Sequence, residues 1–120
     1  VAAVVVNTSI PVESISALVE KVAVPVCVTA CAADDVVRRQ IAAGASIVNV
    51  AAGSRTPQVV EALRREYPDL PIIATGGPTD DAIRATIAAG ADAVSWTPPA
   101  IADLEREVME KARRLAAELL

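Results

Sequence analysis

The chain contains no histidine and no phenylalanine, and it has only one tryptophan, one tyrosine and one methionine. The absence of histidine excludes Ser-His-Asp and Cys-His catalysis within the chain, imidazole proton transfer and most zinc sites. The shortage of aromatic residues means that Ala, Val, Leu and Ile must build the core. Two cysteines, Cys27 and Cys31, are too few for a disulfide scaffold, so we expect reduced thiols in a cytoplasmic protein.

Basic residues are also scarce, with 11 Lys and Arg against 15 Asp and Glu among 120 residues, for a formal net charge of -4. This balance argues against electrostatic capture of nucleic acid or of an anionic membrane. No apolar run approaches the roughly 20 residues of a membrane span, and no basic-then-apolar signal peptide is present. The sequence therefore predicts neither a nucleic-acid partner nor a membrane partner.

The chain instead shows a regular alternation of short apolar runs and amphipathic segments. The apolar runs are Val1–Asn7, Pro25–Thr29, Ser46–Ala51, Pro71–Ala74 and Ala91–Trp96. The first is short and rich in β-branched residues, as expected for a strand buried on both faces. The segments with helical spacing are Ile10–Val22, Asp34–Ala43, Thr56–Tyr67, Thr79–Ala89 and Ile101–Leu119. Thr56 and Thr79 are expected to cap their helices. The alternation predicts an α/β protein with a parallel sheet and right-handed crossovers.

Two architectures accommodate such a (βα)5 repeat. One is a half-barrel-like segment of a TIM barrel, and the other is a flavodoxin-like open doubly wound sheet. A central first strand would favour the open sheet, whereas sequential neighbours would favour the barrel. We expect residues 1–120 to form a single domain, either complete or part of a longer barrel. An incomplete barrel would leave strand edges and its inner face exposed, so self-association through these edges is expected.

An internal repeat supports the βα organisation. The stretch 39–48 (RQIAAGASIV) aligns with the stretch 85–94 (ATIAAGADAV). Each contains a glycine, Gly44 or Gly90, at the point where a helix ends and a strand follows. Both glycines are expected to adopt the left-handed conformation of a helix C-terminus, away from the ligand-binding edge.

Candidate ligand-binding residues follow the strands, because both architectures bind ligands at the carboxyl ends of parallel strands. Thr75-Gly76-Gly77, followed by Pro78, is a turn whose amides could hold a phosphate or a carboxylate, and the alternative is a tight turn that needs positive φ. Asn49 either bonds neighbouring backbone or faces a polar pocket. Arg55 is either a partner for an anion or a solvated loop charge.

Acidic pairs occur in two places, but both pairs lie at the start of a predicted helix. Asp34-Asp35 and Asp80-Asp81 each favour the positive end of a helix dipole. We therefore predict no metal site, and nothing in the sequence indicates a cofactor.

The stretch from Ser46 to Pro99 resembles the phosphate-binding half of the 2-keto-3-deoxy-6-phosphogluconate aldolase-like family of barrels. The similarity lies in Tyr67-Pro68-Asp69, in the run ending at Thr75-Gly76-Gly77, and in Ala88-Ala89-Gly90-Ala91. The resemblance implies that the Thr-Gly-Gly turn binds the carboxylate or phosphate end of a substrate.

Two departures from that family bear on catalysis. Asn49 stands in the place of the Schiff-base lysine, and it cannot form an imine. Ser95, Trp96 and Thr97 stand where the family's final strand ends in glycines. We therefore expect binding of a small anionic metabolite, a sugar phosphate or a 2-keto acid, without a complete catalytic set. A lyase activity would need missing units or a second chain. The alternatives are an interaction or signalling domain, and an inactive scaffold that is designed or excised.

Overall fold

The computed structural model describes residues 1–7, 10–77, 79–96 and 101–119, so Pro78 and Thr97 lie outside the described residues. Within this part of the chain a single parallel sheet contains β1 (Val4–Val6), β2 (Val26–Ala30), β3 (Ile47–Val50), β4 (Ile72–Thr75) and β5 (Ala93–Ser95). The helices that alternate with them are α1 (Val12–Lys21), α2 (Asp35–Ala42), α3 (Thr56–Glu66), α4 (Asp80–Ala88) and α5 (Ile101–Leu119). The predicted α/β class with a parallel (βα)5 repeat is confirmed.

The strands lie in the sheet in the order in which they occur in the chain, β1-β2-β3-β4-β5. This is the arrangement of neighbouring strands in a (βα)8 barrel, whereas a flavodoxin-type sheet places its first strand between the second and third. The sequential order makes β1 and β5 the two edge strands.

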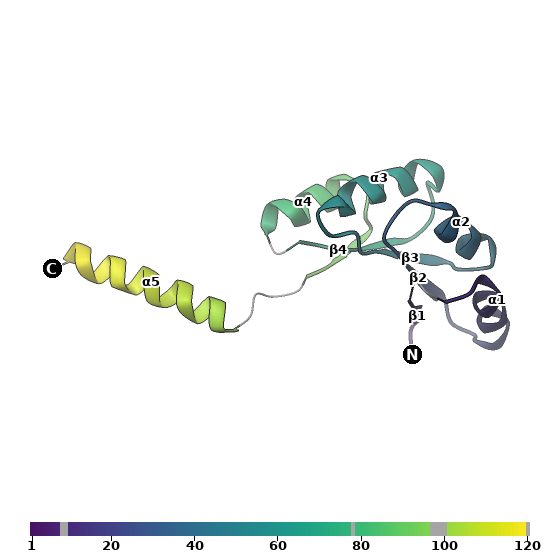
Figure 1. Cartoon of the computed structure of the whole chain (residues 1–120), viewed down its shortest axis with the longest axis horizontal. Coiled ribbons are helices and arrows are strands. Elements are labelled where there is room, and N and C mark those ends of the chain that lie inside the picture. The colour runs from purple at the N-terminus through teal and green to yellow at the C-terminus, as the bar shows by residue number, and fades with distance from the viewer. Residues whose placement is uncertain (8–9, 78, 97–100, 120) are drawn as a thin grey trace.

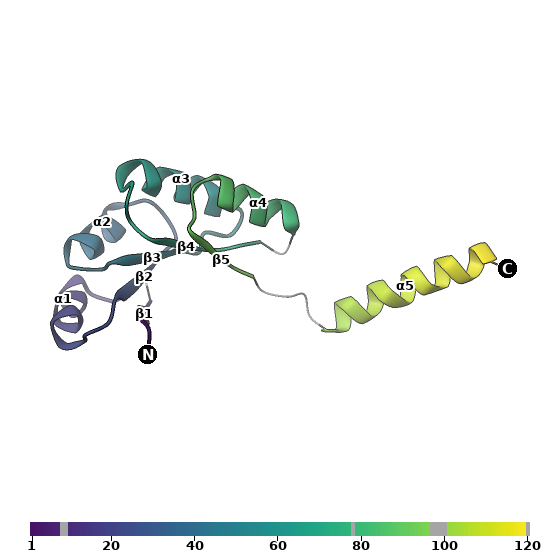
Figure 2. The same cartoon turned by 180° about the vertical axis from the view of Figure 1, so that it is seen from behind.

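Helices α1 to α4 lie on one face of the sheet (Figures 1 and 2). Right-handed crossovers that always step to the next strand require this arrangement. The strand residues that point toward these helices form the core: Val6, Val26, Val28, Ala30, Val48, Val50, Ile72 and Ala74. Ile15, Val37, Val60 and Leu63 of the helices pack against them and are fully or almost fully buried.

No helix covers the opposite face of the sheet in the described part of the chain, and we call it the open face. It carries Val5, Cys27, Thr29, Ile47, Asn49, Ile73, Thr75, Ala93 and Ser95 by strand alternation. Val5 is 63% exposed. The expectation that the first strand is buried on both faces is therefore wrong, because β1 lies at the edge of the sheet and no helix covers Val5 in the described part of the chain.

Local capping follows the sequence at three of the four expected positions. Gly44 and Gly90 have φ values of 110° and 107°, as predicted for the ends of α2 and α4. Thr79 caps α4 and accepts a hydrogen bond from the amide of Ala82 at 3.2 Å. Thr56, however, is not the N-cap of α3. A short 3-10 helix, η1 (Gly53–Arg55), runs directly into α3, so Thr56 is already helical.

Arg64 of α3 joins α3, β4 and the start of β5 at the amino-terminal edge of the sheet. Its guanidinium donates to the carbonyls of Gly90 and Leu70 at 2.8 Å, and to the carboxylate of Asp92 at 2.7 Å. The same carboxylate oxygen accepts a hydrogen bond from the amide of Ile72 at 2.8 Å. The pKa of Asp92 is lowered mainly by the bond from the Ile72 amide and further by Arg64. These hydrogen bonds and the ion pair therefore stabilise this edge of the sheet, which is opposite the ligand-binding edge.

Helix α5 stands apart from the other elements in both views (Figures 1 and 2). None of its 19 residues is buried. The molecule extends over 68 Å along its longest axis, and its radius of gyration is 18.8 Å. A compact domain of this length would have a radius of gyration of about 14 Å. The difference arises from α5.

Candidate functional site

A cavity of about 690 Å³ lies at the carboxyl edge of β3 and β4, between the first turns of α3 and α4. One wall consists of Ala51, Gly53, Ser54, Thr56, Pro57 and Gln58, and the other consists of Thr75, Gly76, Gly77, Ala82, Ala85 and Thr86. We call it the carboxyl-edge cavity. The predicted Thr-Gly-Gly turn therefore lines a cavity large enough for a small metabolite.

The two glycines of the turn are needed because their surroundings leave no room for a side chain. A Cβ atom at Gly76 would lie 2.5 Å from Cγ1 of Val94, and one at Gly77 would lie 2.7 Å from Cβ of Ala82. Neither glycine has positive φ. The alternative interpretation, a tight turn that needs positive φ, is therefore wrong, and close packing against β5 and α4 is the reason for glycine here.

The turn offers fewer amide donors than a bare Gly-Gly loop would. The amide of Gly76 donates to the carbonyl of Ser95 at 2.9 Å, which extends the β4–β5 ladder by one bond. The amide of Gly77 makes no hydrogen bond within the described residues. Beyond it, the first amides of α4 have no intrahelical partner, and Thr79 satisfies only that of Ala82. Gly77 and the start of α4 are thus the donors available to a ligand.

Four polar side chains that line the carboxyl-edge cavity fall into two classes. Thr56 and Thr86 are buried, and their hydroxyls are already engaged: Thr56 accepts from the Ala52 amide at 3.1 Å, and Thr86 donates to the Ala82 carbonyl at 2.8 Å. Ser54 and Gln58 are exposed at the cavity wall and make no hydrogen bond within the described part of the chain. The second pair can therefore bind a ligand without loss of an existing bond.

The other two predicted site residues lie outside the carboxyl-edge cavity. Asn49 is on the open face, where the strand register pairs it with Thr29 on one side and Ile73 on the other. Arg55 is exposed on η1, between the lining residues Ser54 and Thr56. The structure thus brings Thr75, Gly76 and Gly77 together in the cavity wall, and it places Arg55 between two lining residues of the opposite wall. Asn49 shares the open face with Thr75 but does not line the cavity.

Sequence reasoning misses Gln58 and Thr86 as lining residues. Gln58 follows Pro57 in the first turn of α3, a position that always lies near the carboxyl edge of a parallel sheet. Thr86 lies about one turn after Ala82 in α4, and it lines the cavity only because α3 and α4 pack side by side. Gln58 could be predicted from its place at the start of a helix, whereas Thr86 can be identified only when the packing of the two helices is known.

A second cavity of about 220 Å³ lies at the start of α2. Asp34 caps this helix, because its carboxylate accepts hydrogen bonds from the amides of Val36 at 3.0 Å and Val37 at 3.2 Å. A carboxylate already occupies the position that an anion would take. The neutral Thr79 cap of α4 leaves the carboxyl-edge cavity better suited to a negatively charged ligand.

The charges around the carboxyl-edge cavity are mixed. No Lys or Arg is among its described lining residues, while Asp80 and Asp81 occupy the first turn of α4. Asp81 forms an exposed ion pair with Arg84 at 3.7 Å, and such pairs contribute little. Attraction of an anion would therefore depend on the amides, the two helix dipoles and the nearby Arg55.

The thiols differ in environment. Both cysteines are free; Cys27 is buried on β2, and Cys31 is exposed just after that strand. Burial raises the pKa of Cys27, and a hydrogen bond with the backbone of Asn49 lowers it by a smaller amount. Cys27 is thus held as a neutral thiol.

Among the described residues, no three acidic or cysteine side chains come together in a way that could hold a metal ion. In the same part of the chain, no helix combines the length and the apolar character that crossing a membrane requires.

No protein-family model and no curated protein matches the chain.

Proposed function

We propose that the protein binds a small anionic metabolite, a sugar phosphate or a 2-keto acid, in the carboxyl-edge cavity. The observation that carries this proposal is the position of the Thr-Gly-Gly turn in the wall of a 690 Å³ cavity between two helix N-termini. Ligands of barrel and open-sheet α/β proteins bind at this edge.

In the proposed complex, the charged end of the ligand lies at Gly77 and the first turn of α4. The free Gly77 amide and the unpaired amides of the helix supply the hydrogen bonds, and the positive end of the helix dipole supplies the field. The side chains of Ser54 and Gln58, which lack partners within the described residues, bind the hydroxyl or carbonyl groups of the ligand body. Arg55 contributes a positive charge at the mouth.

Asn49 has a separate role in this proposal. Its place on the open face, in the row with Thr29 and Ile73, would bring it to a ligand only from the inner side of a barrel. Any lyase activity would likewise require groups from further units or a second chain, because a primary amide cannot replace the lysine of an imine mechanism.

A titration followed by amide NMR tests the binding proposal. The whole chain is titrated with a pentose phosphate, with pyruvate and with inorganic phosphate. We expect the amide resonances of Gly77 and Thr75 to move, while those of Gly44 and Gly90, at the opposite edge, stay unchanged. If the Gly77 resonance is unmoved by all three probes, the proposal is wrong.

Matched alanine variants localise the ligand. Ser54→Ala and Gln58→Ala each remove one ligand-binding group that has no role in the fold, and each is expected to weaken binding by about tenfold. Ser14→Ala is the control, because Ser14 is an exposed residue of α1, far along the chain from the cavity. Equal affinities for all three variants would exclude the carboxyl-edge cavity as the site.

A second candidate function is that of an interaction domain, and the observation that favours it is the uncovered sheet face. Val5 is 63% exposed on the edge strand β1, and Ala93 and Ser95 are exposed on the edge strand β5. We propose that these edges self-associate, as unpaired strand edges tend to do. The exposed free thiol of Cys31 supports a reducing compartment such as the cytoplasm.

A further inference from the structure

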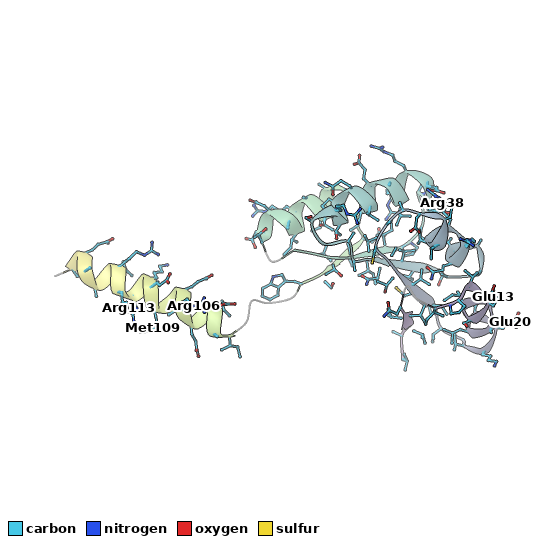
Figure 3. All side chains as sticks on the ribbon, viewed as in Figure 1. Glu13, Glu20, Arg38, Arg106, Met109 and Arg113 are labelled. Carbon is cyan, nitrogen blue, oxygen red and sulfur yellow. The ribbon has the colours of Figure 1, made fainter. Side chains whose placement is uncertain are left out.

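Helix α5 lacks the contacts that normally stabilise a helix. It has 19 residues, which gives a length of about 28 Å, and none of these residues is buried. Figure 3 shows side chains such as those of Arg106, Met109 and Arg113 projecting from α5 with no other element beside them. In proteins most helix stability comes from the packing of an apolar face, so α5 needs a partner surface.

The sequence of α5 provides such a face. Apolar residues recur at intervals of three and four, the spacing that places them along one side of a helix: Ile101, Leu104, Val108, Ala112, Leu115 and Leu119. Ile101, Val108 and Leu119 are 75%, 65% and 85% exposed. We call this row the α5 stripe. It runs the full length of the helix without interruption.

The charges of α5 indicate which partner fits the stripe. Residues 101–110 contain four acidic residues and one basic residue, whereas residues 111–119 contain three basic residues and one acidic residue. An identical helix in antiparallel orientation therefore places the acidic half of each copy against the basic half of the other. A parallel pair would place like charges together along the whole contact.

We propose that α5 pairs in antiparallel orientation with α5 of a second copy of this chain, through the α5 stripe. In this pairing Val108 lies opposite Ala112 of the partner subunit, near the two-fold axis. Glu107 and Arg114 both border the stripe on the same side, one heptad apart, so Glu107 faces Arg114 of the partner subunit. The antiparallel helix dipoles add to the attraction.

This surface is separate from the strand edges and from the carboxyl-edge cavity, so its failure would leave the binding proposal untouched. The competing occupant of the stripe is the outer side of α4, where Ile87 is 55% exposed. That surface presents one large exposed side chain, whereas a second α5 presents a stripe of matching length and opposite charge order.

Sedimentation equilibrium of the full chain over a concentration series tests the pairing. We expect a monomer–dimer equilibrium, and we expect Val108→Lys to raise the dissociation constant by about a hundredfold, because each dimer loses two buried apolar contacts. Ala117→Lys is the matched control. It adds the same charge on the opposite side of α5 and should leave the equilibrium unchanged.

Charge reversal distinguishes antiparallel pairing from other contacts. Glu107→Lys places two like charges together on each side of the two-fold axis, so it should weaken the dimer. The double variant Glu107→Lys/Arg114→Glu should restore it, because the two residues are too far apart within one helix to interact with each other. Weakening without restoration overturns the antiparallel arrangement.

The other occupants give distinct results. A monomeric wild-type chain, or a dimer that Val108→Lys leaves intact, overturns the proposal. If Ile87→Lys dissociates the dimer as strongly as Val108→Lys, α5 docks on α4 of the partner subunit instead. If only Val5→Lys has an effect, the strand edges carry the association.

Discussion

Gln40 and Thr86 occupy the same position in the internal repeat, and both are buried, but their side chains differ in hydrogen bonding. The hydroxyl of Thr86 donates to the Ala82 carbonyl at 2.8 Å. The side-chain nitrogen of Gln40, in a residue that is 1% exposed, has no partner among the described residues. The buried polar side chain is therefore hydrogen-bonded in the second copy of the repeat, whereas in the first copy its nitrogen is an unpaired donor among the described residues.

Replacement of Gln40 should consequently stabilise the protein. Gln40→Leu removes the unpaired donor from the helix–sheet contact at nearly constant volume, and we expect the free energy of unfolding to rise by about 1–2 kcal/mol. Urea denaturation measures the change. Thr86→Val is the matched control at the equivalent position, and it should give no comparable gain because it removes a hydrogen bond that is satisfied. A Gln40→Leu variant less stable than wild type would indicate that an ordered water or ligand binds this side chain.

Gly76 should tolerate no side chain. In Gly76→Ala the new methyl group meets Val94 and, at 3.1 Å, Cγ1 of Ile83, so we expect a loss of about 2–3 kcal/mol in the free energy of unfolding. A Val94→Ala background should recover part of this loss, since the closest contact would be gone. Gly53→Ala is the control: its φ is 60°, but no atom lies within 4 Å of the new Cβ, so we expect only the backbone cost of about 1 kcal/mol.

The Asp92 carboxylate should make stability depend on pH in the acidic range. Its pKa is lowered from the usual 3.8 in the folded chain, so its stabilising contribution is fully present above that value and is lost as the pH falls through the folded pKa. We expect Asp92→Asn to unfold with a smaller change in free energy between about pH 7 and about pH 3 than the wild type. Equal pH dependence in both proteins would contradict the contribution of the Ile72 amide and Arg64.

The two thiols should react at very different rates. Cys31 is exposed, whereas Cys27 is 1% exposed and burial raises its pKa, which reduces the reactive thiolate. Ellman's reagent should therefore modify one thiol rapidly in the folded protein and the second only on unfolding. Cys31→Ser should abolish the fast phase and Cys27→Ser should preserve it. Two fast thiols in the folded chain would show that β2 opens readily.

The sequence predicts the order and type of all five βα units, because each has a β-branched run, a helical segment and a turn signal. It predicts the conformation of Gly44 and Gly90 for the same local reasons. Properties that depend on neighbouring units are not predicted. Thr56 is not a cap because η1 precedes it, and Gly76 is a glycine because Val94 of the next strand lies against it.

The candidate site shows the same division. The Thr-Gly-Gly turn is found from the sequence because its composition is local, and it does line the carboxyl-edge cavity. The loss of the Gly76 amide to Ser95 is not predictable, because it depends on the register between β4 and β5. Asn49 is assigned to the same group of residues because it also lies near the end of a strand, but the register sets it level with Ile73, two residues before Thr75, and it does not line the cavity.

The sequential strand order gives each βα unit the same relation to its predecessor, with one crossover hand and one covered side. A duplicated βα unit can therefore be added next to an edge strand, and the path of the earlier units through the sheet does not change. The near-identical turns at Gly44 and Gly90 are what such copying would leave behind.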